Sequence, residues 1–127
     1  ASDVYKRQVL NALFVVGVFG TELYASELIS KDIKLYHPYG IVINKDVVLG
    51  EGVVLRQQVT IGNKGSESDN SCPTIGKNID IGAGAKIIGG VTIGDNCKIG
   101  ANAVVTKSFP ANSVLVGVPA KNINTSI

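Results

Sequence analysis

The chain has no Met and no Trp, and its 127 residues include only two Cys and one His. Phe and Tyr are also scarce, at three and four residues, so a core must be filled by aliphatic side chains. Two cysteines, Cys72 and Cys97, are too few for a disulfide framework or a cysteine zinc site. They favour a reducing compartment, and we expect a cytoplasmic protein.

The sequence also lacks an excess of charge of either sign. Twelve Lys and Arg stand against ten Asp and Glu, for a net charge of +2, and the basic residues do not cluster with aromatics, which argues against nucleic-acid binding. No apolar run reaches the roughly 18 residues that span a bilayer. Neither a phosphate-binding loop nor a metal-ligand cluster is present, so we expect no metal. A hydrophobic content of 45% argues for one folded domain.

The N-terminal region divides into two parts. Residues 1–8 resemble a translated sequencing adapter, and we expect them to be a scar. Residues 9–21 form a mostly apolar segment, too short to span a membrane. Three interpretations stay open: the remnant of a helical domain that precedes the core, the start of the core, or the end of a membrane segment.

What the sequence does contain is a six-residue repeat. Aliphatic residues recur in steps of six at Leu23, Ile29, Leu35; at Ile43, Leu49, Leu55, Ile61; and at Ile75, Ile81, Ile87, Ile93, Ile99, Val105. Gly often follows them, as at Gly50 and Gly82, and a small or branched apolar residue lies two places before. Helices prefer steps of three and four and strands alternate by two, so the repeat fits neither.

A short strand followed by a tight turn does fit a period of six, with the aliphatic side chain inside and Gly giving the corner its backbone freedom. Three such units make one coil of a triangular β-helix. We therefore predict an all-β parallel β-helix of about four coils over residues 22–105, followed by a C-terminal tail over 106–127. Each buried aliphatic side chain would contribute about 1.5–3 kcal/mol once coils stack.

The step of six is broken twice. From Leu35 to Ile43 it is eight, and this insertion holds the single histidine, His37. From Ile61 to Ile75 it is fourteen, so residues 63–73 must leave the coil as an extruded, polar loop. Each break departs from the repeat, and such departures are where functional residues are expected.

The repeat resembles the hexapeptide-repeat acyltransferases. The pattern His-x-x-Gly-Ile-Val-Ile after the step of eight, and the step of fourteen after it, are similar to the serine O-acetyltransferases from about Leu23 to Ile123. This resemblance implies a left-handed β-helix and transfer of an acetyl group from acetyl-CoA to L-serine, for cysteine biosynthesis. It also implies a homotrimer with active sites between subunits.

The resemblance assigns His37 as the general base and Glu22, fifteen residues earlier, as its acidic partner, where the family usually has Asp. An imidazole with a pKa near 6.5 suits removal of a hydroxyl proton near neutrality. A carboxylate would orient the ring and stabilise the imidazolium. The alternatives are a structural histidine at a loop corner and a solvated surface carboxylate.

The resemblance also assigns the donor site. Ala83 and Ala101, just after repeat glycines, would let the pantetheine arm approach the backbone, and Asn63 stands at another contact position where the family has Gly. Lys107 and Lys121 would meet the phosphates of coenzyme A. Lysines in a surface tail are more often simply solvated.

Three residues depart from the serine acetyltransferases at positions that contact the amino-acid substrate. Tyr36 replaces an acidic residue before the histidine, and Ser71 and Cys72 replace an Arg-His pair. The acceptor is therefore less well supported than the acetyl transfer, and we retain a sugar hydroxyl and a non-catalytic scaffold as alternatives. Cys72 lacks a second histidine to activate it, which favours an incidental thiol; Cys97 occupies a core position.

Overall fold

The computed structural model describes residues 6–7, 20–23 and 27–124, and those described residues include short strands separated by turns. The strands are β1 (Glu22–Leu23), β2 (Lys34–Leu35), β3 (Val42–Ile43), β4 (Val48–Leu49), β5 (Val54–Leu55), β6 (Thr60–Gly62), β7 (Thr74–Ile75), β8 (Asp80–Ile81), β9 (Lys86–Ile88), β10 (Thr92–Ile93), β11 (Lys98–Ile99), β12 (Val104–Val105), β13 (Val114–Val116) and β14 (Lys121–Asn122). Lys6 and Arg7 are helical and exposed.

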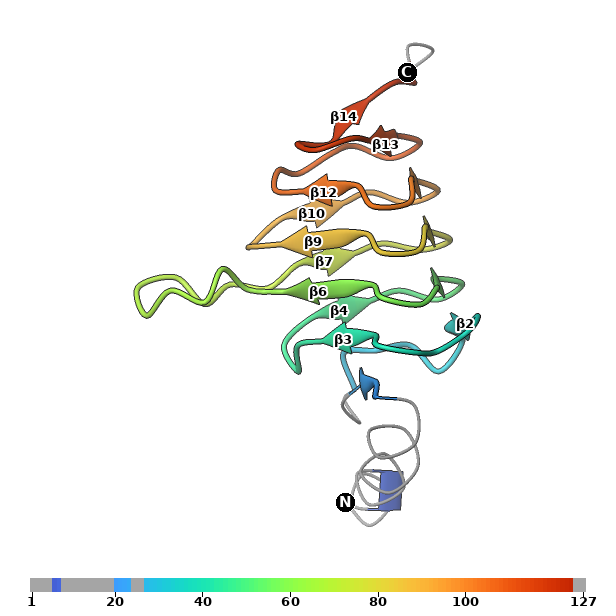
Figure 1. The fold of residues 1–127 in the computed structure, drawn as a ribbon, viewed down its shortest axis with the longest axis vertical. Helices are drawn as coiled ribbons and strands as arrows, with labels where there is room; N and C mark the ends of the chain where they lie inside the picture. Colours follow the sequence, from blue (N-terminus) through green and yellow to red (C-terminus); the bar gives the residue numbers. More distant parts are fainter. Residues whose placement is uncertain (1–5, 8–19, 24–26, 125–127) are drawn as a thin grey trace.

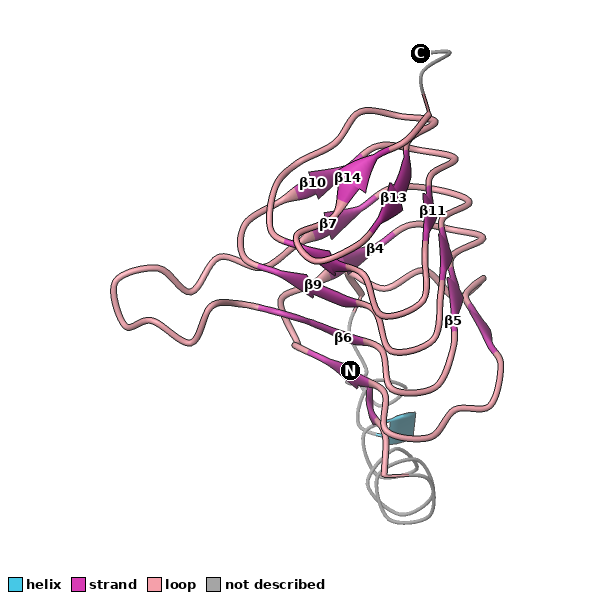
Figure 2. Ribbon diagram, turned by 45° about the horizontal axis from the view of Figure 1, so that its top comes forward, coloured by secondary structure: helices cyan, strands magenta, loops and turns pink. Residues whose placement is uncertain are grey.

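These strands form three parallel sheets around one core. Sheet A has the order β1-β3-β6-β9-β12, sheet B the order β10-β7-β4 and sheet C the order β14-β13-β11-β8-β5-β2. From β1 to β13, successive strands along the chain belong to different sheets, so the chain winds as a solenoid with a triangular cross-section (Figures 1 and 2). The predicted fold class is confirmed: the protein is a parallel β-helix, consistent with a left-handed one.

The solenoid is longer than the sequence indicated. Sheet A alone stacks five strands, where about four coils were expected. The last coil continues beyond Val105, because Phe109 bridges to Ile93 and β13 pairs in parallel with β11. The chain then reverses, and β14 pairs antiparallel with β13. The described part of the expected tail, residues 106–124, therefore contributes to the β-helix and covers the end of sheet C.

The core follows the six-residue repeat. The aliphatic positions from Ile43 to Val105 are all buried, as are the smaller residues two places before them, including Cys97. Register explains this, since aligned strands place Ile43, Ile61 and Ile87 over one another in sheet A. The repeat positions at the N-terminal end are less covered: Leu23 in β1 is partly buried, and Leu35 in β2, at the N-terminal end of sheet C, is 38% exposed.

The repeat glycines make room for the backbone of the neighbouring coil and do not supply backbone freedom at the corner, which corrects the expectation from the sequence. A Cβ at Gly50 would lie 2.5 Å from the carbonyl oxygen of Gly76, and one at Gly82 would lie 2.5 Å from the nitrogen of Ala101. The left-handed φ occurs two residues later, at Gly52, Gly84 and the corresponding Asn residues Asn78, Asn96, Asn102 and Asn112. Glycine at these corners lets consecutive coils touch.

The expectations for the N-terminus fall mostly outside the described residues. Of the proposed scar over 1–8 only residues 6–7 are described, and of the segment 9–21 only Gly20 and Thr21. Within the described part of the chain, the structure has no helix long and apolar enough to cross a membrane.

Replacing Ile81 with Asp tests the register. Ile81 is fully buried in β8, and a carboxylate there has no partner, so we expect a loss of more than about 4 kcal/mol and failure to fold. Ile81→Val, which costs about 0.5–1.5 kcal/mol, is the matched control. Thermal unfolding followed by circular dichroism measures both, and an Asp variant that melts near the parent temperature would refute the register.

Candidate active site

His37 lies on a widened corner of the β-helix. The C–A corner is the set of turns that lead from sheet C to sheet A, at residues 36–41, 56–59, 82–85 and 100–103. The turn at 36–41 holds two more residues than the others. His37 adopts a left-handed φ of 50° there, and its carbonyl accepts a 2.6 Å hydrogen bond from the amide of Tyr39. The extra residues leave the imidazole exposed.

The turns of the C–A corner are stacked in register. The amide of Gln58 donates to Tyr39 O at 2.9 Å, that of Gly84 to Gln57 O at 3.0 Å, and that of Asn102 to Ala83 O at 2.9 Å. His37, Ala83 and Ala101 therefore lie along one edge of the molecule. The predicted base and two of the predicted donor residues are brought to the same corner.

The last turn of this edge leads to Lys121. Residues 117–120 stack on β12, since Val104 N donates to Gly117 O and Ala120 N donates to Val104 O. Four strand spacings of about 4.8 Å separate this turn from the turn of His37, or about 19 Å. The exposed Lys121 follows directly, at the opposite end of the edge from His37.

Glu22 lies one coil below His37. Its amide donates to Ile41 O at 2.7 Å, and the neighbouring hydroxyl of Thr21 donates to Pro38 O at 2.6 Å, which joins the two turns. Glu22 is exposed, and no hydrogen bond or ion pair joins it to His37, both of which are described. The two residues are on adjacent coils, and their pairing stays a prediction.

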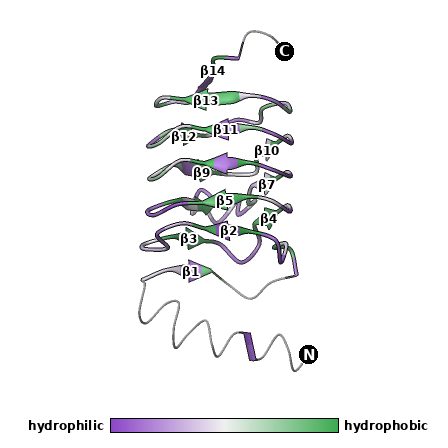
Figure 3. Cartoon of the chain, turned by 90° about the vertical axis from the view of Figure 1, so that its right-hand side faces the viewer, coloured by the Kyte–Doolittle hydropathy of each residue, from purple (hydrophilic) through white to green (hydrophobic). Residues whose placement is uncertain are grey.

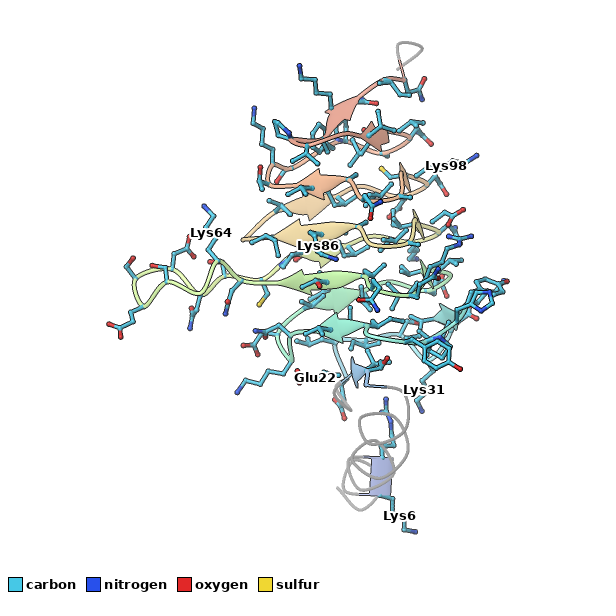
Figure 4. The ribbon with its side chains drawn as sticks, in the orientation of Figure 1. Lys6, Glu22, Lys31, Lys64, Lys86 and Lys98 are labelled. Carbon is cyan, nitrogen blue, oxygen red and sulfur yellow. The ribbon has the colours of Figure 1, made fainter. Side chains whose placement is uncertain are left out.

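Glu22 also lines a groove on the outer face of sheet A. The groove has a volume of about 550 Å³ and is lined by Glu22, Val42, Ile43, Asn44, Lys45, Thr60, Ile61, Gly62, Asn63 and Ile88. In Figure 4, Glu22 and Lys86 lie on this same face, with Glu22 nearer the N-terminal end. The groove therefore contains one predicted catalytic residue and one predicted donor residue, Asn63.

The extruded loop lies at the other edge of sheet A. The A–B corner is the set of turns from sheet A to sheet B, and residues 63–73 leave it between β6 and β7 (Figure 1). Local side-chain hydrogen bonds shape the loop: Asn63 Oδ1 accepts from Gly65 N at 2.9 Å, and Asp69 Oδ1 from Ser71 N at 3.0 Å. The Ser71 bonds hold the pKa of Asp69 below its usual value.

Ser71 and Cys72 are therefore not brought to His37 within one chain, because the width of sheet A separates the A–B and C–A corners. Lys107 also lies at the A–B corner, in the turn after β12, and is exposed. Of the predicted residues, Tyr36 stands beside His37, while Ser71, Cys72, Asn63 and Lys107 share the opposite edge.

Cys72 is a poor nucleophile in this setting. Burial, with a smaller contribution from the charge of Asp46, raises the pKa of its thiol. Its sulfur lies 3.8 Å from Asn70 O. A raised pKa leaves less thiolate at neutral pH, which favours an incidental thiol.

A charged residue beside Tyr36, the chain neighbour of His37, was missed by the sequence analysis. The guanidinium of Arg56 lies 5.7 Å from the centre of the Tyr36 ring, forms an ion pair with Asp80, and donates to Ile81 O at 3.2 Å. The signal was present in the repeat: the residue after the core aliphatic is Gly at positions 82 and 100, but Tyr36 and Arg56 on the two lower coils.

The described residues contain no group of three or more His, Cys, Asp or Glu that could hold a metal ion. The C–A corner presents an exposed imidazole at His37, the guanidinium of Arg56, and the small residues Ala83 and Ala101.

Comparison with known proteins gives three kinds of similarity. Residues 72–107 match the family model "Bacterial transferase hexapeptide (six repeats)". The chain is 37% identical to the putative colanic acid biosynthesis acetyltransferase WcaB of Escherichia coli K12, over 91% of this chain and 78% of that protein. It is 35% identical to the serine acetyltransferase of Synechococcus elongatus, over 84% of this chain and 44% of that enzyme.

Among solved structures, the serine acetyltransferase of Brucella abortus in complex with coenzyme A superposes with a TM-score of 0.78 at 37% identity, over 85% of this chain and 43% of that one. The chain thus spans less than half of these serine acetyltransferases, but about three quarters of WcaB.

Cys72→Ser tests whether the thiol takes part in chemistry. Because the raised pKa of Cys72 argues against a covalent role, we expect the variant to keep at least about half of the parent turnover. Alkylation by iodoacetamide should be slower than that of a free thiol at pH 7 and should accelerate above the usual thiol pKa. Loss of turnover by a factor of 100 with an unchanged fold would contradict this assignment.

Proposed function

We propose, from the premise that this chain belongs to the serine acetyltransferase-like hexapeptide-repeat acyltransferases, that it is an acetyl-CoA-dependent O-acetyltransferase. The observation that carries the proposal is the alignment of His37, Ala83 and Ala101 along the C–A corner. A base at one end of a narrow edge, with small residues above it, suits a long acyl carrier whose reactive end reaches the base.

In the proposed reaction, His37 accepts the proton of the acceptor hydroxyl while the hydroxyl oxygen attacks the thioester carbonyl. The carbon–sulfur bond then breaks, the ester is released, and the imidazolium returns its proton to the coenzyme A thiolate. No covalent enzyme intermediate is needed. The exposed position of His37 on a widened turn leaves room for both substrates.

Glu22 is proposed to orient His37 or to stabilise the imidazolium. Support comes from the hydrogen bonds that join residues 21 and 22 to the turn after His37. The longer side chain of Glu can extend from the adjacent coil toward the turn of His37.

For the donor, Ala83 and Ala101 would border the pantetheine arm, and Lys121 would meet the phosphates at the far end of the edge. The spacing of about 19 Å between the turns of His37 and Lys121 suits an extended carrier. Asn63 and Lys107 would contribute from the opposite edge of sheet A. We propose that the reaction takes place in the cytoplasm, where acetyl-CoA is available.

We propose a homotrimer, because within one chain the width of sheet A separates the predicted site residues at the C–A corner from those at the A–B corner. In a trimer, the C–A corner of one subunit can face the A–B corner and loop of its neighbour. Ser71, Cys72 and Asn63 of one subunit would then complete the site of His37 in the next.

Two acceptors compete. L-Serine, with O-acetylserine as a precursor of cysteine, is supported by similarity to serine acetyltransferases. A sugar hydroxyl in surface-polysaccharide assembly is supported by two further observations: the chain is 37% identical to the putative colanic acid biosynthesis acetyltransferase WcaB, and Tyr36, Ser71 and Cys72 depart from the amino-acid site. We favour the sugar hydroxyl, because these three residues lack the charges expected of a site for an amino acid.

His37→Ala should lower turnover by roughly 10²–10⁴-fold, which is what a positioned general base contributes. Coenzyme A affinity should survive, because Ala83 and Ala101 lie on other coils. Glu22→Gln should cost less, since the imidazole stays in place. Single-turnover acetyl transfer by the parent and both variants, with calorimetric binding of coenzyme A alongside, measures these effects.

Three results are informative about the base. An unchanged rate in His37→Ala of an active enzyme would refute the mechanism, and equal losses in His37→Ala and Glu22→Gln would make Glu22 as important as the base. A parent without any acetyl transfer would favour the scaffold alternative.

An acceptor panel separates the two substrate classes. With thiol release from acetyl-CoA as readout, we expect methyl glycosides to give a kcat/KM at least about tenfold above that of L-serine, because Ser71 and Cys72 lack the charge that would bind an amino acid. Efficient turnover of L-serine, with a KM in the range usual for enzymes, would instead support the serine acetyltransferase activity.

A further inference from the structure

We propose that Arg56 is a specificity-determining residue that selects hydroxyl acceptors lacking an ammonium group. It would do so by holding the Tyr36 ring and a fixed positive charge beside His37. This inference rests on the proposed function, because it assigns the acceptor side of the same site. Neither residue serves the proposed proton transfer.

Arg56 is held by three contacts on two neighbouring coils. Its Nη1 donates to a carboxylate oxygen of Asp80 and to Ile81 O at 3.2 Å, while its guanidinium lies 5.7 Å from the centre of the Tyr36 ring. An arginine side chain is normally mobile, and these contacts restrict it. Both hydrogen bonds of Arg56 use Nη1, so among the described residues Nε and Nη2 have no hydrogen-bond partner.

The position of Arg56 follows from the register of sheet C. Leu35 pairs with Leu55, and Tyr36 N donates to Leu55 O at 2.9 Å, so Tyr36 and Arg56 are stacked as the first residues of consecutive C–A turns. Figure 3 faces sheet C, where β2 and β5 are neighbours in the stack. Tyr36 precedes His37 directly and is 51% exposed. The pair therefore forms part of the surface next to the imidazole.

The ion pair between Arg56 and Asp80 has its positive and negative ends on different sides. Asp80 lies on the coil above, paired in register with Val54, while the guanidinium reaches down to Tyr36. The ion pair is thus a dipole with its positive end over the aromatic ring. An acceptor that carries an ammonium group against Tyr36 meets this positive end. A neutral ring-shaped acceptor can instead pack its C–H face on Tyr36 and accept hydrogen bonds from Arg56.

The test compares acceptors that differ in the ammonium group alone. Methyl glucoside is paired with methyl 2-amino-2-deoxyglucoside, and glycerate is paired with L-serine. For each pair, kcat/KM for the acceptor without the ammonium group is divided by kcat/KM for the acceptor that carries it. This ratio is measured in the parent, Arg56→Gln, Arg56→Lys and Tyr36→Ala. Dissociation constants of the same acceptors from the coenzyme A complex give a second ratio that needs no turnover.

We expect Arg56→Gln to lower the ratio by about three- to tenfold, as loss of a nearby charge predicts, and Arg56→Lys to restore most of it. Tyr36→Ala should raise the KM or dissociation constant of the neutral glycoside by about tenfold, with the KM for acetyl-CoA unchanged. A residue with a merely structural role would move both members of a pair equally.

Lys77→Gln is the matched control, because Lys77 forms a comparable exposed ion pair with Glu51 at 3.5 Å but lies between sheets B and C. It should leave every ratio unchanged. Melting temperatures of all variants should stay within a few degrees of the parent, since exposed ion pairs contribute little to stability.

Failure of the inference differs from failure of the proposed function. Acetyl transfer or acceptor binding with the same ratio in the parent, Arg56→Gln and Arg56→Lys would overturn the role of Arg56 and leave the acetyltransferase intact. The absence of acetyl transfer and of coenzyme A binding would overturn the proposed function, and the inference with it. A parent that prefers the ammonium-bearing acceptor would also overturn the inference.

Discussion

Close contact between consecutive coils is the constraint on which this structure depends. Strand backbones stack in parallel register, and at the corners the carbonyl and amide groups of one coil lie where a Cβ of the next would be, as at Gly82 against Ala101. Such packing leaves no room for an added residue inside the stack. Any insertion must therefore leave the β-helix at a corner, and both insertions of this chain do so.

The two insertions lie at opposite edges of sheet A. Two extra residues widen one C–A turn and hold His37 in a left-handed conformation, and residues 63–73 leave the A–B corner. A backbone in this region is costly for a residue other than glycine, and the surrounding coils stabilise it. The regular repeat supplies the frame, and one of its two interruptions holds the proposed base, His37.

The repeat made most of the fold predictable, because a period of six admits few alternatives once helices and alternating strands fail. It identified the buried positions from Ile43 to Val105, and both interruptions. It did not reveal that Phe109 and Leu115 continue the core, because the step from Val105 to Phe109 is four and returns to six only at Leu115. The role of the repeat glycines was also misread, because spacing cannot distinguish a left-handed φ from a close approach.

The candidate site was less predictable than the fold, because its residues interact across coils. The sequence places Arg56 twenty positions after Tyr36 and twenty-four before Asp80, and only stacking brings the three side chains together. Resemblance transfers positions where a motif matches, such as His37, but it is silent where the chain departs from the family. At Tyr36 the departure has a partner in Arg56, whose guanidinium lies 5.7 Å from the centre of the ring. In our proposal this cation decides which acceptor approaches His37, while the edge formed by Ala83 and Ala101 would serve the donor.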